Sequence, residues 1–254
     1  MKSYNPVKVH AMAIHSIIGA LNDLFFPPRC LTCAATLENS RPPLLCPRCQ
    51  EKIEPISSPL CVCCGAPFAT GRNHLCGVCL QGNYFFDLAR SSYVYNRQLS
   101  PLIHSLKFNF TTKSASSLGA LTKISGVYSQ FSIPDIIVPV PLHITRLRKR
   151  GYNQALILAR SCFSTWRDRI HVRAIQRHRL TPPQTGLSGK ERKNKLRGCF
   201  SLRQPDLLAG KRILLVDDVF TTGTTVNECA KTIRQAHPAG IEVFTLARSI
   251  LKNR

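Results

Sequence analysis

Acidic residues are scarce in this sequence. Of its 254 residues only 13 are Asp or Glu, whereas 35 are Lys or Arg, which gives a formal net charge of +22. So large an excess points towards polyanionic ligands, namely nucleic acid, phosphates or an acidic membrane surface.

Two further features are missing. The chain has no apolar run of about 18 or more residues, which argues against a membrane-spanning helix. It also has no G-x-x-x-x-G-K-[ST] motif, so it is not a P-loop ATPase by itself. Intrinsic disorder as the main state is excluded, because 44% of the residues are hydrophobic. The length indicates one or two domains with a real core.

The positive charge is concentrated in one stretch. Residues 141–212 hold 18 Lys and Arg but only 3 Asp and Glu, a net of +15. This distribution indicates a localised anion-binding face rather than a uniformly basic surface.

The cysteines form a second concentration. Nine of the twelve lie between residues 30 and 79, and eight of these make four C-x-x-C pairs: Cys30/Cys33, Cys46/Cys49, Cys61/Cys64 and Cys76/Cys79. A two-residue spacer lets both thiolates face one ion, and two pairs complete a tetrahedral four-thiolate site. We therefore predict two structural Zn²⁺ ions. Which pairs share an ion is open, and Cys63 or His74 is an alternative ligand in the second site.

A disulfide framework is the alternative to zinc, but it needs an oxidising compartment. The apolar stretch at residues 11–26 makes a poor signal peptide and a better short amphipathic helix. We therefore expect a reduced, cytoplasmic protein.

From Tyr84 onwards the pattern predicts an α/β domain. Buried strands are expected at residues 135–141, 212–216 and 241–247, and a short one at 172–175. Helices are expected at residues 152–166 and from about 224, whereas 143–151 is expected to be a basic loop and 177–198 a long loop. Alternating strands and helices favour a mostly parallel sheet with ligands at the carboxyl ends of its strands.

The most informative segment follows the second of these strands, as Asp217-Asp-Val-Phe-Thr-Thr-Gly-Thr-Thr225. Backbone N–H groups and hydroxyls of a Thr/Gly loop at a helix N-terminus can cradle a phosphate. Two carboxylates cannot bind that phosphate, but they can accept hydrogen bonds from the vicinal hydroxyls of a sugar. Phosphate and diol together suggest a ribose 5-phosphate.

This segment resembles the PRPP signature of type I phosphoribosyltransferases, and further motifs narrow the resemblance to one family. The matching segments occur in order: Phe25-Phe-Pro-Pro-Arg-Cys30, the four C-x-x-C pairs, Leu102-Ile-His-Ser-Leu-Lys-Phe108, Val138-Pro-Val-Pro141, Arg150-Gly-Tyr-Asn-Gln154 and Arg177-His-Arg-Leu-Thr181 with Gln184. Together they resemble the ComF/GntX family, a double zinc ribbon joined to a type I phosphoribosyltransferase-like domain. The expected division is an N-terminal helix or arm (1–28), the double zinc ribbon (29–82) and the phosphoribosyltransferase-like domain (84–254).

The resemblance implies roles for individual residues. Asp217 and Asp218 match the ribose-binding acids, and the 5-phosphate loop comprises Thr221, Thr222, Gly223, Thr224 and Thr225. The turn after Pro141 matches the pyrophosphate loop, with the candidate anion contacts Arg146, Arg148, Lys149 and Arg150. Arg179, Thr181 and Gln184 fall in the flexible catalytic loop, and Arg179 is a catalytic candidate beside the two acids. One departure is Lys195, which stands where the family usually has Asn, while Asn194 is one residue early.

Two functions follow from the resemblance. ComF-like proteins are associated with natural transformation or with the use of DNA as a nutrient, which implies a PRPP-type pocket beside a basic face for single-stranded DNA. The DNA-contact candidates are Lys190, Arg192, Lys193, Lys195 and Arg197. Because no P-loop is present, a separate ATP-dependent helicase would drive strand import. Tyr152 and Trp166 suit base stacking, although core packing is expected for Trp166.

The alternative is a catalytic phosphoribosyltransferase that moves ribose 5-phosphate from PRPP to a nucleobase or related acceptor. Mg²⁺ and basic side chains then neutralise the leaving pyrophosphate. A solvated loop is the competing explanation for the basic residues between 190 and 197.

Overall fold

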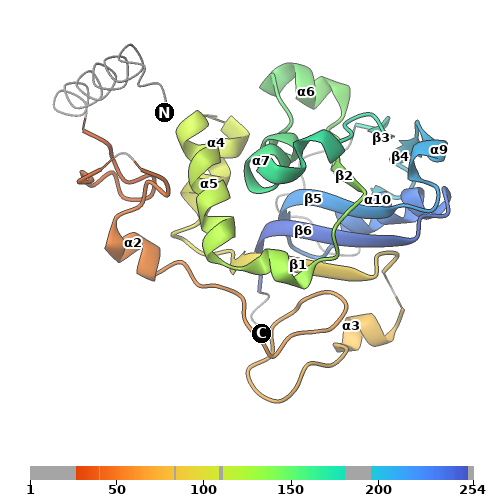
Figure 1. The fold of residues 1–254 in the computed structure, drawn as a ribbon, viewed down its shortest axis with the longest axis horizontal. Helices are drawn as coiled ribbons and strands as arrows, with labels where there is room; N and C mark the ends of the chain where they lie inside the picture. Colours follow the sequence, from red (N-terminus) through yellow and green to blue (C-terminus); the bar gives the residue numbers. More distant parts are fainter. Residues whose placement is uncertain (1–26, 40, 83, 109–110, 181–195, 251–254) are drawn as a thin grey trace, which may run out of the picture.

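The computed structural model describes residues 27–39, 41–82, 84–108, 111–180 and 196–250. In this part of the chain a four-stranded sheet with helices on both faces follows a cysteine-rich segment with little regular structure (Figure 1). The expected N-terminal helix or arm lies outside the described residues except for its last two. None of the described helices has the length and apolar character that a membrane span requires.

All neighbouring strands of the main sheet are parallel, as predicted. Their order across the sheet is β1 (Leu88–Val94), β6 (Gly240–Arg248), β5 (Arg212–Phe220) and β2 (Ile136–Pro139). A separate antiparallel pair joins β3 (Ile175–Arg177) to β4 (Phe200–Leu202).

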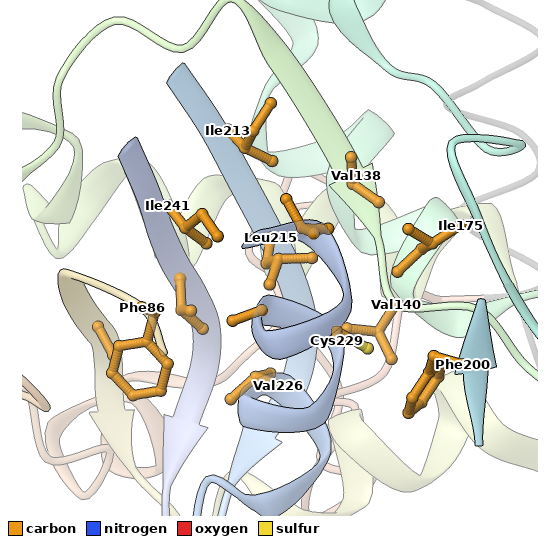
Figure 2. Close-up of a cluster of buried hydrophobic side chains, with 14 of the residues drawn as sticks. Phe86, Val138, Val140, Ile175, Phe200, Ile213, Leu215, Val226, Cys229 and Ile241 are labelled. Carbon is orange, nitrogen blue, oxygen red and sulfur yellow. The ribbon is translucent and has the colours of Figure 1, made fainter. Parts of the chain in front are cut away.

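The central strands are apolar at almost every position because both faces of the sheet are covered. On one face Ile213, Leu215 and Ile241 pack against α10 (Thr224–Arg234) (Figure 2). On the other face Leu214 and Val216 pack with three helices: α4 (Ser100–Phe108), α5 (Thr112–Ile124) and α7 (Gln154–Cys162). The remaining short elements are η1 (Val127–Gln130), η2 (Ser164–Arg169) and α9 (Pro205–Leu208).

The cysteine-rich segment straddles the sheet. It contains only two short helices, α2 (Pro47–Glu51) and α3 (Gly77–Leu80). Its first half contributes Cys30 and Cys49 to the core beneath α4 and α5, whereas its second half contributes Cys61 and Cys64 to the core on the α10 face. The segment is therefore part of both cores rather than an appendage.

Both edges of the sheet are covered by irregular chain. Beside β1, the amide of Ile56 donates to the carbonyl of Ser92 (3.0 Å) and the amide of Val94 donates to the carbonyl of Glu54 (2.9 Å). Beside β2, the amide of His171 donates to the carbonyl of Ile137 (2.9 Å). These bonds satisfy backbone groups that an edge strand otherwise leaves unpaired.

The sequence-based boundaries differ from the structure in two helical segments and in two strands. The predicted basic loop contains the helix α6 (Ile144–Arg150), which begins where His143 accepts from the amide of Thr145 (3.2 Å) and ends at Gly151 with φ 81°. The predicted helix ends at Cys162, and Trp166 lies in η2, stacked on Phe163 as core packing requires.

The strands shift as well. The short strand predicted at 172–175 lies at Ile175–Arg177. The strand predicted to end at Val216 continues through both aspartates to Phe220, because β6 pairs with it as far as Arg248.

Candidate functional site

The eight C-x-x-C cysteines gather in two clusters. Cys30, Cys33, Cys46 and Cys49 form the first, and Cys61, Cys64, Cys76 and Cys79 form the second. Within each cluster the ligand atoms lie within 4.8 Å of one another. Consecutive pairs therefore share a site, which settles the pairing. Of the described residues, neither Cys63 nor His74 joins a cluster; the His74 ring stacks on Phe68 and its Nδ1 lies 2.7 Å from the carbonyl of Arg72.

The protonation of these thiols fits a bound cation. Against the effect of burial, backbone N–H groups lower the pKa of Cys30 to about 7 and that of Cys61 to about 6. Burial and the neighbouring cysteines raise the pKa of Cys49 and Cys79. Four thiolates this close cannot all ionise unless a cation neutralises them, and a closed four-sulfur set is typical of structural zinc.

The second group of candidate residues stands at the end of β5. Asp217 and Asp218 are both buried, at 8% and 6% exposure. Lys107, near the end of α4, lies 2.7 Å from Asp218 through its Nζ atom. Burial lowers the pKa of Lys107, but the charge of Asp218 outweighs burial and raises it. Burial and the charge of Asp218 raise the pKa of Asp217 to about 8.

The loop after β5 is shaped for close approach to a ligand. Gly223 has φ 72°, and a Cβ built on it would lie 2.4 Å from Cζ of Phe220. Only glycine fits there without a shift of the ring. No side chain caps the N-terminus of α10, which begins at Thr224, so its first amides have no side-chain cap as a hydrogen-bond partner. Residues Asp217 and 219–226 line a small hollow, and Thr222 and Thr224 are joined there by a hydroxyl–hydroxyl contact of 2.7 Å.

Two side chains hold this loop, and one of them also contacts the second cysteine cluster. The Tyr84 hydroxyl donates to the carbonyl of Thr222 (3.1 Å). The Arg248 guanidinium donates to the carbonyl of Cys64 (2.7 Å) and lies 4.4 Å above the Phe220 ring. The ring that excludes a side chain at Gly223 is therefore held from the cysteine-rich segment.

The predicted anion contacts lie in three places: on a helix, near a strand end, and in residues that the structure does not describe. Arg146, Arg148, Lys149 and Arg150 all lie on α6, none of them buried. Burial and the charges of Arg177 and Arg150 lower the pKa of Arg146. Arg179 and Arg197 are exposed. Thr181, Gln184, Lys190, Arg192, Lys193, Asn194 and Lys195 lie outside the described residues.

Sequence reasoning did not single out three residues that the structure places at these sites: Lys107, Arg177 and Tyr84. Lys107 and Arg177 stand inside segments that carry the family resemblance, so a signal for them was present. No sequence signal marks Tyr84, because its role depends on a contact with Thr222, 138 positions away in the chain.

Comparisons with known proteins agree with this architecture. The chain matches a double zinc ribbon domain over residues 21–80 and a phosphoribosyl transferase domain over residues 171–252. Competence protein F of Haemophilus influenzae is 35% identical over 231 residues, covering 89% of this chain and 99% of that protein. DNA utilization protein YhgH of Escherichia coli K12 is 36% identical over 199 residues, covering 75% and 85%.

Among solved structures, purine phosphoribosyltransferase from Pyrococcus horikoshii is similar with a TM-score of 0.31 and 14% identity, covering 52% of this chain and 80% of that chain.

The clusters predict the metal content of the protein. Purified wild-type protein should contain about two zinc ions per chain, and Cys49→Ser should contain about one, because three thiolates hold the ion far more weakly than four. Cys63→Ser is the matched control, since this cysteine lies beside the second cluster without joining it, and it should retain two. Elemental mass spectrometry measures the content; loss of an ion from Cys63→Ser, or none from Cys49→Ser, would contradict the assignment.

The raised pKa of Asp217 predicts a pH-dependent stability. In the unfolded chain this carboxyl ionises near its ordinary value of 3.8, whereas in the folded protein it holds its proton up to about pH 8. Its contribution to stability is therefore complete below 3.8 and is lost as the pH rises towards 8. Between about pH 6 and about pH 8 the wild type should lose about 2 kcal/mol relative to Asp217→Asn. Urea unfolding of both proteins measures the difference; parallel pH curves would refute it.

Proposed function

The chain belongs to the ComF/GntX family, and from that membership we propose that it acts in the uptake or utilisation of DNA, as its relatives' names indicate, and binds a ribose 5-phosphate such as PRPP at the end of β5. The assignment of this ligand rests on one observation. Two buried acids and a helix N-terminus without a side-chain cap are joined by a Thr/Gly loop. The acids reject a phosphate that the loop attracts, so the pair suits a ligand with a diol at one end and a phosphate at the other.

Each part of the pocket has a defined task in this proposal. The amides and hydroxyls of residues 221–225 hold the 5-phosphate, while Asp217 and Asp218 accept hydrogen bonds from the ribose hydroxyls. Lys107 pairs with Asp218 and so keeps this side chain in place beside the ligand. Carboxylate and substrate oxygens are the ligands that Mg²⁺ prefers, so a PRPP-bound Mg²⁺ fits here and would neutralise pyrophosphate charge.

The DNA-handling part of the proposal rests on charge. The excess of +15 in residues 141–212 exceeds what one pyrophosphate needs, and a polyanion with many phosphates accounts for the surplus. Lys190, Arg192, Lys193, Lys195 and Arg197 are the proposed strand contacts at the end of this stretch. Clustered thiols require a reducing compartment, so we place the protein in the cytoplasm, with a separate ATP-dependent helicase as partner.

A second candidate function is transfer of the phosphoribosyl group to a nucleobase. The observation that favours it is the lowered pKa of Arg146, caused by burial and by repulsion from Arg177 and Arg150, which a bound pyrophosphate would relieve. In this function Arg179 would contact the leaving group. Release of pyrophosphate from PRPP in the presence of a panel of bases distinguishes turnover from binding alone.

The pocket predicts how PRPP affinity responds to mutation. In isothermal titration with PRPP and Mg²⁺, the double variant Asp217→Asn/Asp218→Asn should bind about a hundredfold more weakly than wild type, because amides replace both carboxyl groups that accept from the ribose hydroxyls. Lys107→Gln should show a smaller loss, since it removes only the partner of Asp218.

Asp206→Asn is the matched control, because this exposed acid lies on α9 away from the pocket, and its affinity should equal that of wild type. Binding of single-stranded DNA should be retained by every one of these variants. A wild-type protein that binds no PRPP would end the ribose-phosphate proposal.

A further inference from the structure

A large cavity lies apart from the ribose-phosphate site. Its volume is about 770 Å³, and it is enclosed by α6, α7, β3 and residues 203–204. No residue of the hollow at the end of β5 lines it. The volume falls in the range that accommodates a drug-sized ligand, about 300 to 1,000 Å³.

The cavity combines apolar walls with cationic side chains. Ile144, Leu147 and Leu156 form part of the apolar wall, and Tyr152 adds an aromatic ring. Ile144 is 48% exposed although it lines the cavity, so an apolar surface is left open to solvent. An exposed apolar surface rimmed by charge is typical of a binding site.

The charge around the cavity has one sign. Four arginines line it, Arg160, Arg173, Arg177 and Arg203, and no acidic residue does. Within the described part of the chain, Arg160, Arg173 and Arg203 form no ion pair with an acid. Arg203 Nε donates to the side-chain carbonyl of Gln176, which holds an amide group at the cavity wall.

We propose that this cavity receives a base of a single DNA strand, whose phosphates lie against Arg160, Arg173 and Arg203. The inference rests on the DNA-handling function proposed above and assigns that function a place. Leu147 and Leu156 contact the flat face of the base, Tyr152 stacks on it, and the Gln176 and Gln204 amides face its polar edge. Base–aromatic stacking beside a cationic track is the way in which proteins hold single strands without sequence preference.

The distribution of cations favours a strand over a free nucleotide. One nucleotide needs one or two cationic partners, whereas arginines enter this cavity from α7, from β3 and from the chain before α9, and α6 adds four more basic residues. A series of phosphates that continues beyond the cavity uses them all. Neutralising each phosphate releases counterions, which gives the binding a measurable salt dependence.

Fluorescence anisotropy with a labelled thymidine oligonucleotide of about 12 residues tests the inference. Arg173→Gln/Arg203→Gln should lower the affinity and reduce the slope of log K against log salt by about two, because two phosphate contacts are removed. Ile144→Trp fills the cavity without changing charge, so it should lower affinity about tenfold and leave the slope unchanged. Arg41→Gln/Arg72→Gln is the matched control, since both residues are exposed in the cysteine-rich segment, and should equal wild type.

The outcomes separate this inference from the proposed function. Strong wild-type binding that neither cavity variant weakens would overturn the inference and leave DNA handling intact. No wild-type binding would overturn both. A change of oligomeric state on Ile144→Trp, without loss of DNA affinity, would identify the cavity as an interface between copies of this chain and overturn the inference.

Two further measurements give independent support. PRPP affinity should be unchanged in Arg173→Gln/Arg203→Gln, and the circular dichroism spectrum of Ile144→Trp should match that of wild type, which shows that the variants fold. Ultraviolet cross-linking of a bromouracil-substituted strand should label peptides from residues 144–160 or 171–177; labelling confined to other peptides would contradict the assignment.

Discussion

Eight thiols held in two sets of four are the constraint on which the rest of this structure depends. The segment that carries them has two helices of only five and four residues, so regular hydrogen bonding does little to hold it. A cation at each cluster replaces that missing framework. The clustered cysteines then complete the cores on both faces of the sheet, and Cys64 supports Arg248 above Phe220. The shape of the proposed phosphate loop is thus linked to the second cluster.

Groups of opposite charge stand in different parts of the α/β domain. Two buried acids stand at the end of β5, where Lys107 pairs with Asp218, whereas the cations on α6 are not buried. Only the acids therefore lie in a low-dielectric setting. In the proposed function, a ligand that presents hydroxyls to the acids and a phosphate to the loop suits this arrangement.

The features that could be predicted from the sequence are those marked by a pattern of residue types over a short stretch of chain. The C-x-x-C pairs, the apolar strands and the Asp217–Thr225 segment each carry their signal within a few neighbouring residues. The helix at Ile144–Arg150 was missed because its residues are basic and exposed, so no apolar periodicity marks it. Tyr84 and Arg248 act through contacts with residues far away in the chain, and the cavity is bounded by three separate stretches of the chain. Such features arise only when the chain has folded.

Irregular chain covers both edges of the main sheet, and this limits how the molecule can assemble. Residues 54–56 lie along β1, and residues 170–171 lie along β2. Among the described residues neither edge of this sheet therefore offers a full run of backbone donors and acceptors to another polypeptide. Growth of the sheet by an incoming strand, the common route to intermolecular β-pairing, is blocked on both sides. Among the described residues, the surfaces left for assembly with a second protein are helical faces, loops, the β3–β4 pair and the cysteine-rich segment.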